Sequence, residues 1–139
     1  MKDNKARSFV TIMLVIAITA LFLRIAIEQI IRFNIAQNES SASANLKLMA
    51  TALENFAKNH SGVFPQSISI LTQTNPAYLD MDYVGQSPLK GYNYTCPRLD
   101  ASGYNCYASP TYCSLTGGKI FNITTGGLFV SEDCSVKKE

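Results

Sequence analysis

An uncharged apolar run near the N-terminus constrains this chain more than any other feature. The 15 residues from Phe9 to Leu23 carry no charge. Three basic residues stand just before this run: Lys2, Lys5 and Arg7. A helix of 15 residues is about 22 Å long, which is shorter than the ~30 Å hydrocarbon layer of a membrane. The positive charges of the leader predict that the N-terminus of the chain faces the cytoplasm and that the residues after the apolar helix are exported.

The apolar pattern does continue, with two charged interruptions, Arg24 and Glu28, before Ile31. A helix from Phe9 to Ile31 is about 34 Å long, enough to cross a bilayer. Residues four apart share a helix face, so we expect Arg24 and Glu28 to form a charge pair that reduces the cost of placing them in the membrane. The small-x-small site of a cleaved secretory signal does not follow the apolar core, which favours an uncleaved or N-terminally trimmed anchor.

The uneven charge distribution suggests how the chain is organised. Residues 1–33 contain five basic and two acidic residues, a net charge of +3, whereas residues 34–139 have a net charge of −1. We interpret 1–8 as a basic leader, 9–33 as a membrane or filament-core helix, and 34–139 as one globular head. The near-neutral head gives no basic surface, so nucleic-acid binding is not predicted.

The clearest helical periodicity lies in residues 42–58. Apolar residues recur there with the spacing of one helix face: Leu46, Met49, Ala50, Leu53, Phe56 and Ala57. This spacing predicts an amphipathic helix that continues to about residue 60 and packs on the rest of the head. Gly62 and Pro65 are expected to stop it.

The C-terminal third contains residues typical of strands. We expect a loop over residues 61–90, with short helical turns at 67–71 and 76–79, and then an antiparallel β-meander over 91–134. Its strand candidates are residues 92–96, 104–108, 120–123 and 128–131, with hairpin signals between the first two and between the last two. Five tyrosines of this region are expected to pack the sheet, with a binding surface as the alternative: Tyr92, Tyr94, Tyr104, Tyr107 and Tyr112. The predicted fold class is α+β, a long helix on a small sheet.

All four cysteines lie in this C-terminal part, and they lack the CxxC spacing of a zinc site. In a small exported head they predict two disulfides, for which three pairings are possible. Cys113 and Cys134 flank the second hairpin, so we favour their pairing, which leaves Cys96 with Cys106.

The sequence shows no catalytic set, and we do not expect an enzyme. His60 is the only histidine and falls at the predicted end of the helix, where we expect it to be exposed. Two acidic pairs, Asp80 with Asp82 and Glu132 with Asp133, could bind Ca²⁺, although solvated loops are the favoured interpretation because neither lies in a dense Asp/Asn/Gly loop. No metal site or other cofactor is predicted.

Taken in order, several segments resemble the type IV pilins and the pseudopilins of type II secretion. Lys5-Ala6-Arg7 and Ser8 before Phe9 are similar to the prepilin cleavage region, and FVTIMLVIAI resembles the apolar run that follows it. SASANLKLMATALENFAKNHSGVFP, GYNYTC and KIFNITTGGLFVSEDC resemble later parts of pseudopilin-like heads. The resemblance implies a pilin-like fold, cleavage by a prepilin peptidase between Ser8 and Phe9, and N-methylation of Phe9.

Three positions depart from the family pattern. Ser8 replaces the usual glycine, Met13 replaces the usual glutamate four residues after the phenylalanine, and Glu28 stands where a proline is usual. In the family, such a buried carboxylate can offset the N-terminal amine of a neighbouring subunit. Because Met13 cannot do this, the resemblance implies a minor or specialised subunit and not a major one.

The leading hypothesis is therefore a structural subunit held in a bacterial inner membrane, with a single span, a cytoplasmic N-terminus and an extracytoplasmic head. Its expected partners are itself or other pilin-like subunits, together with the prepilin peptidase and assembly machinery. The alternative is a membrane-anchored binding or sensor module that never assembles.

Overall fold

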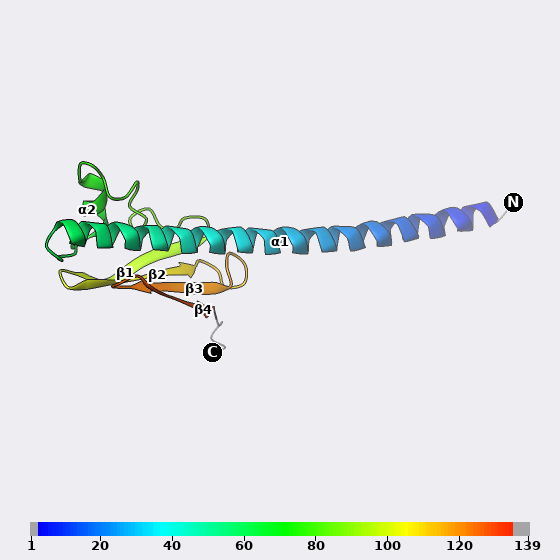
Figure 1. Ribbon diagram of the computed structural model, residues 1–139. Coiled ribbons are helices and arrows are strands. Elements are labelled where there is room, and N and C mark those ends of the chain that lie inside the picture. The colour runs from blue at the N-terminus through cyan, green and yellow to red at the C-terminus, as the bar shows by residue number, and fades with distance from the viewer. Residues whose placement is uncertain (1–2, 135–139) are drawn as a thin grey trace. The chain divides into compact units, whose positions relative to one another are not determined.

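The structure is a computed structural model, and it describes residues 3–134. It divides into two compact units, Met1–Asn34 and Ile35–Glu139. In the described residues, the first unit contains only the start of the long helix α1 (Asp3–Asn59). The second unit, hereafter the head, contains the remainder of α1, a short helix and a four-stranded sheet (Figure 1).

The part of α1 that belongs to the head has one buried face. All six residues of the predicted stripe are buried, and Leu46, Met49 and Leu53 have no exposed surface. Figure 1 shows the sheet along one side of this part of α1. The 3.6-residue period therefore identified the packing face of the helix correctly.

The helix ends where the sequence predicts. Ser61 and Gly62 both have positive φ, and the Gly62 N–H donates to the Ala57 carbonyl at 2.8 Å. A residue in the left-handed conformation turns the chain back over the last helical turn and satisfies a free carbonyl there. Pro65 follows within three residues and prevents the helix from resuming.

The sheet is an antiparallel meander of order β1-β2-β3-β4. Its strands are β1 (Tyr92–Asp100), β2 (Gly103–Pro110), β3 (Lys119–Thr124) and β4 (Leu128–Asp133). Both hairpin predictions are confirmed: two residues join β1 to β2, and three residues that include Gly126 and Gly127 in positive φ join β3 to β4. The α+β fold class is thus confirmed, with an architecture consistent with a pilin-like fold.

Some local predictions were wrong. β1 does not end at Cys96 but continues to Asp100, because a change of register between Thr95 and Arg98 lets the strand accommodate Pro97, which cannot donate a ladder hydrogen bond. Of the two helical turns predicted in the loop before β1, the first, at 67–71, is confirmed by the short helix α2 (Ile68–Gln73). The second predicted turn, 76–79, is not helical, since the N–H groups of Tyr78 and Leu79 donate back to the Leu71 carbonyl.

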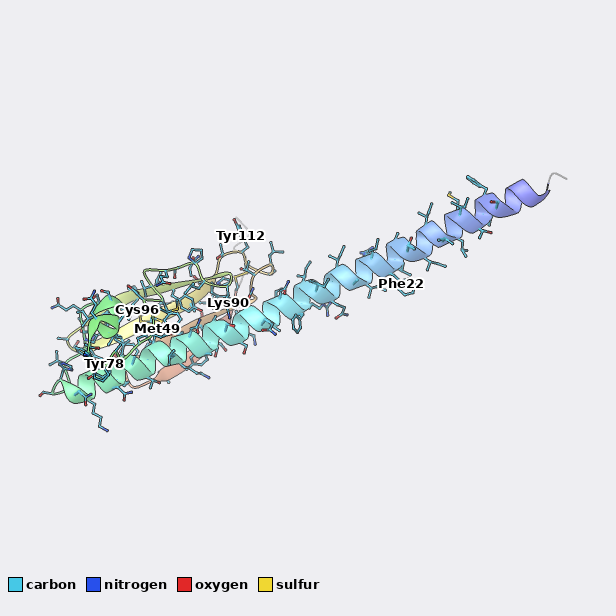
Figure 2. The ribbon with its side chains drawn as sticks, turned by 90° about the horizontal axis from the view of Figure 1, so that it is seen from above. Phe22, Met49, Tyr78, Lys90, Cys96 and Tyr112 are labelled. Carbon is cyan, nitrogen blue, oxygen red and sulfur yellow. A yellow bond between two sulfur atoms is a disulfide. The ribbon has the colours of Figure 1, made fainter. Side chains whose placement is uncertain are left out.

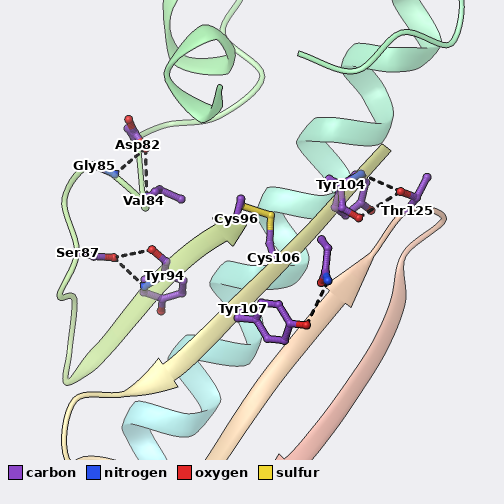
Figure 3. The surroundings of a disulfide bond; sticks show 11 residues. Asp82, Val84, Gly85, Ser87, Tyr94, Cys96, Tyr104, Cys106, Tyr107 and Thr125 are labelled. Atoms are coloured by element: carbon purple, nitrogen blue, oxygen red, sulfur yellow. Dashed lines mark hydrogen bonds between the residues drawn. A yellow bond between two sulfur atoms is a disulfide. The ribbon is translucent and has the colours of Figure 1, made fainter. Parts of the chain in front are cut away.

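The tyrosines of the sheet have two different uses. Tyr92, Tyr94 and Tyr104 are almost completely buried against the helix, as sheet packing predicts. Tyr107 lies on the opposite face of β2 and accepts a hydrogen bond from the Asn105 side chain at 3.1 Å (Figure 3). Tyr112 follows β2 in a loop and is 64% exposed, so its predicted role in packing the sheet was wrong.

Two disulfides join the cysteines in the favoured pairing, Cys96 to Cys106 and Cys113 to Cys134. The first links β1 to β2 next to the register change, as Figure 3 shows. The second ties the loop after β2 to the end of β4, which is where the second hairpin returns the chain. The described residues include no free cysteine.

Candidate membrane and assembly helix

The first unit exposes its apolar side chains. Every Val, Ile, Leu, Met and Phe from Phe9 to Phe33 is exposed, and Phe22 reaches 67%. Figure 2 shows Phe22 pointing away from the helix, whereas Met49, in the head, is completely buried. Among the described residues, this is the one helix that is long and apolar enough to cross a membrane. Because so much contiguous apolar surface is unfavourable in water, the segment is a candidate membrane anchor.

Thr19, one of two threonines in the apolar run, has its hydroxyl satisfied by its own helix. The Thr19 hydroxyl lies 2.9 Å from the carbonyl oxygens of both Val15 and Ile16 and donates to them. A hydroxyl that is bonded within its own helix can enter hydrocarbon at low cost, since it leaves no polar group without a partner. The Thr19 hydroxyl therefore adds no unsatisfied polar group to the apolar surface.

Arg24 and Glu28 form the ion pair that their spacing suggests. The Arg24 Nε lies 3.7 Å from a Glu28 carboxylate oxygen, and the two side chains are 81% and 59% exposed. In water such an exposed pair contributes less than about 1 kcal/mol. Its value would be larger in an apolar environment, where either charge alone is costly.

The predicted processing site lies within the helix. Because α1 begins at Asp3, the bond between Ser8 and Phe9 has helical backbone on both sides. Residues 3–8 of the predicted leader are thus the first turns of the helix. The Phe9 and Met13 side chains are 64% and 56% exposed, and Met13 adds apolar surface where a glutamate would add a charge.

The sequence did not predict the hydrogen bonds between α1 and distant loops of the head. Near the start of the head, the Asn38 side-chain amide donates to the Thr116 carbonyl at 2.9 Å. The neighbouring Glu39 carboxylate accepts the Gly118 N–H at 2.8 Å. These contacts hold the loop between β2 and β3 against the helix across more than 75 residues of sequence.

Glu54 makes a second connection in the C-terminal part of α1, five residues before its end at Asn59. One of its carboxylate oxygens accepts the Gly126 N–H at 2.7 Å and the Tyr104 hydroxyl at 3.0 Å. Burial raises the pKa of Tyr104, and the adjacent Glu54 carboxylate raises it further because a phenolate there would face a negative charge. Glu54 lies beside the predicted apolar stripe, but its distant partners leave no local sequence signal.

A shallow groove of about 490 Å³ lies beside this connection. It runs between α1 and the β3–β4 turn, and its polar lining includes Lys47, Thr51, Glu54 and Asn55. Lys47 lies 4.7 Å above the ring of Phe129, so its charge is held at one side of the groove. The lining contains no histidine or cysteine, and its carboxylate is already engaged by Tyr104 and Gly126.

The side chains of Asp80, Asp82 and His60 have local partners. Asp82 accepts the N–H groups of Val84 and Gly85 at 3.1 and 2.9 Å, which forms a turn (Figure 3). Asp80 accepts the Tyr83 hydroxyl at 3.1 Å. Within residues 3–134, no cluster of three or more metal-binding side chains is found. His60 is exposed, and its Nδ1 donates to the Phe56 carbonyl at 2.8 Å while its ring stacks on the Phe56 ring.

Comparisons with known proteins add no assignment. No family model matches the sequence, and no curated protein or solved structure matches it.

Proposed function

We propose that this protein is a structural subunit of a pilin-like filament, of the type IV pilus or type II secretion pseudopilus kind. Residues 9–33 hold it in the inner membrane with the head on the extracytoplasmic side. The same segment then packs against the corresponding segment of other subunits, of this chain or of other pilin-like chains. A prepilin peptidase and an assembly machinery are the other partners that this function requires.

One observation carries the proposal: a single helix, Asp3–Asn59, has an exposed apolar half and a half with one face buried in the core of the head. A membrane anchor needs only about 20 apolar residues and can be joined to its head by a flexible linker. Here helical residues continue without a break from the apolar segment into the core of the head. In a subunit built this way, the segment that contacts other subunits and the head are joined by continuous helix.

The contacts of Asn38, Glu39 and Glu54 support this interpretation. They attach the helix to the loop between β2 and β3 and to the β3–β4 turn, in addition to the apolar core. A filament subunit must transmit force between its N-terminal helix and its head. Hydrogen bonds at both ends of the buried part of α1 make that connection resistant to sliding.

A membrane-anchored binding module is the alternative, and two observations favour it. Met13 removes the charge that would offset the N-terminus of a neighbouring subunit, and Ser8 replaces the glycine of the usual cleavage site. The groove beside Glu54 would be the first place to look for a ligand of such a module.

Crosslinking in native membranes distinguishes the two functions. All four cysteines are in disulfides, so new cysteines in the helix would be the only free thiols among the described residues. Leu14→Cys together with Ile16→Cys places two exposed thiols about 200° apart around the helix. In cells that contain the assembly machinery, a bifunctional thiol reagent should join subunits into a ladder of higher oligomers.

The matched control is the same double variant in cells that lack the assembly ATPase, where we expect monomers and chance dimers. Mass spectrometry of the mature chain should show an N-terminus at Phe9, with or without a methyl group. Only monomer in both strains, with an intact Met1, would contradict the filament proposal and favour the anchored module.

A further inference from the structure

The loop between β2 and β3, residues 111–118, presents two apolar side chains to solvent. Tyr112 is 64% exposed and Leu115 is 58% exposed, and neither belongs to the core of the head. Figure 2 shows Tyr112 at the edge of the head, directed away from it. Because neither side chain contributes to the packing of the head, both are available for a contact outside the chain.

The loop is held in a fixed conformation. The N–H groups of Leu115 and Thr116 donate to the Tyr112 carbonyl, and the Thr116 hydroxyl accepts the Tyr112 N–H at 3.0 Å. The disulfide from Cys113 to Cys134 ties the loop to β4, and Glu39 ties it to α1 through Gly118. A constrained loop loses little conformational entropy when it binds a surface, which suits it to hold a contact.

Sequence separation keeps this loop close to the end of the apolar helix. Phe33 is the last strongly exposed apolar residue of the N-terminal run, and Asn38, which holds Thr116, follows it by five residues. Five helical residues rise about 7.5 Å, and even a fully extended chain spans at most about 18 Å. The headgroup region on each side of a bilayer is about 5–7 Å thick. If Phe33 marks the edge of the hydrocarbon, the loop is anchored at or just beyond the headgroups.

The charges near the loop favour an apolar contact. Lys90 precedes Gly91, whose carbonyl accepts the Thr111 N–H, and Lys119 follows the loop. Asp133 lies opposite Lys119 in the sheet, and Glu132 precedes it, so among these described residues two exposed cations are balanced by two exposed acids. Balanced charge gives no strong attraction to anionic lipid, whereas tyrosine is enriched where protein meets the headgroups.

We propose that the apex of this loop, Tyr112 and Leu115, is a membrane-contact site that rests in the interfacial layer of the bilayer while the subunit is stored there. This inference depends on the proposed membrane insertion of residues 9–33. The occupant is the lipid surface itself, and the contact restricts the tilt of the head on its anchor before assembly.

The chain contains no tryptophan, so single substitutions provide site-specific probes. We would reconstitute full-length Tyr112→Trp, Phe22→Trp and Val63→Trp variants into phosphatidylcholine vesicles, with or without bromine on the lipid acyl chains. Phe22 probes the inserted helix, and Val63, which is 48% exposed just past the end of α1, is the matched exposed control in the head. Leu115→Trp provides a second probe of the loop.

We expect brominated lipid to quench the probe at Phe22 most strongly, to quench the loop probes clearly less, and to leave the probe at Val63 unchanged. The loop emission should also shift to shorter wavelength on reconstitution and be insensitive to added salt. Quenching at Phe22 with none at Tyr112 or Leu115 would overturn this inference but leave membrane insertion intact. If the Phe22 probe is not quenched, membrane insertion fails and the loop inference fails with it. Equal quenching at Val63 and Tyr112 would also overturn it, because the head would then touch lipid without preference.

Discussion

The N-terminal segment 9–33 and the later part of α1 within the head are both rich in apolar residues, but they differ in what covers those residues. In the head, Leu46, Met49 and Leu53 have no exposed surface and belong to the buried core. In the N-terminal segment, Leu21 and Phe22 remain 59% and 67% exposed, and no other described part of the chain covers them. The comparison shows that apolar content alone does not tell whether a helix packs against its own chain or against something outside it. The one-sided stripe of the head indicates an internal partner, whereas apolar residues on all sides indicate one outside the chain.

The largest effect should come from removing a covered side chain. Leu53→Ala should lower the free energy of unfolding of the head by about 2–5 kcal/mol, because it leaves a cavity in the core. Leu21→Ala, the same substitution on the exposed segment, should change it by less than about 0.5 kcal/mol. Denaturant unfolding of both variants in the same mild detergent, followed by near-UV circular dichroism, measures the difference. Similar losses from both would show that the two segments share a core.

Alkaline pH should destabilise the head through its buried tyrosines. Burial raises the pKa of Tyr92 to about 12, with Glu39 adding to the shift, and burial also raises the pKa of Tyr94. The ordinary pKa of tyrosine is about 10, so the protonated form is favoured in the folded state. This stabilisation is complete below pH ~10 and is lost as the pH rises through the folded-state pKa values. A stability profile from pH 8 to 12 should fall only in its upper part. A flat profile would show that these phenols are not buried in solution.

A smaller loss is expected from the connection at Glu54. Glu54→Ala leaves the Gly126 N–H and the Tyr104 hydroxyl without their acceptor and should cost about 1–3 kcal/mol. Lys58→Ala, one turn later and exposed, is the control and should have little effect. Hydrogen exchange should locate the loss at the β3–β4 turn. A loss spread evenly over the head would argue against a local connection.

The smallest effect concerns the charge pair of the N-terminal segment. Arg24→Ala should impair membrane insertion or assembly more than the double variant Arg24→Ala with Glu28→Ala, because the single change leaves Glu28 unpaired in apolar surroundings. A double-mutant cycle scored by the membrane-inserted fraction gives the coupling. Equal effects of the single and double variants would show that the pair does not act as a unit.

Local sequence patterns predicted the parts of the fold that depend on local chemistry. The stripe from Leu46 to Ala57, the helix stop at Gly62 and the Gly126-Gly127 turn each follow from residue type and spacing. Contacts between distant residues were not predictable in this way. Nothing in the local sequence marks Glu39 and Glu54 as contact residues, because their partners at Gly118 and Gly126 lie more than 70 residues away.

Regions where two local signals compete were also predicted poorly. Pro97 signals the end of a strand, but the register change allows β1 to continue past it. Tyr112 was grouped with the tyrosines expected to pack the sheet, but β2 ends at Pro110 and the side chain lies in a loop. The membrane and assembly roles of Ser8, Phe9, Arg24 and Glu28 depend on partners outside the chain and therefore remain predictions.

Removing residues 1–34 tests most directly the claim that the two regions have different partners. The truncated chain, residues 35–139, should be soluble without detergent, monomeric by analytical ultracentrifugation, and should unfold with the same midpoint as the head of the full chain. The full chain should require detergent to remain in solution. A truncated chain that unfolds or aggregates would contradict the account, because the head would then depend on the exposed segment. A full chain that stays monomeric in plain buffer would contradict it equally, since its apolar helix would need no partner.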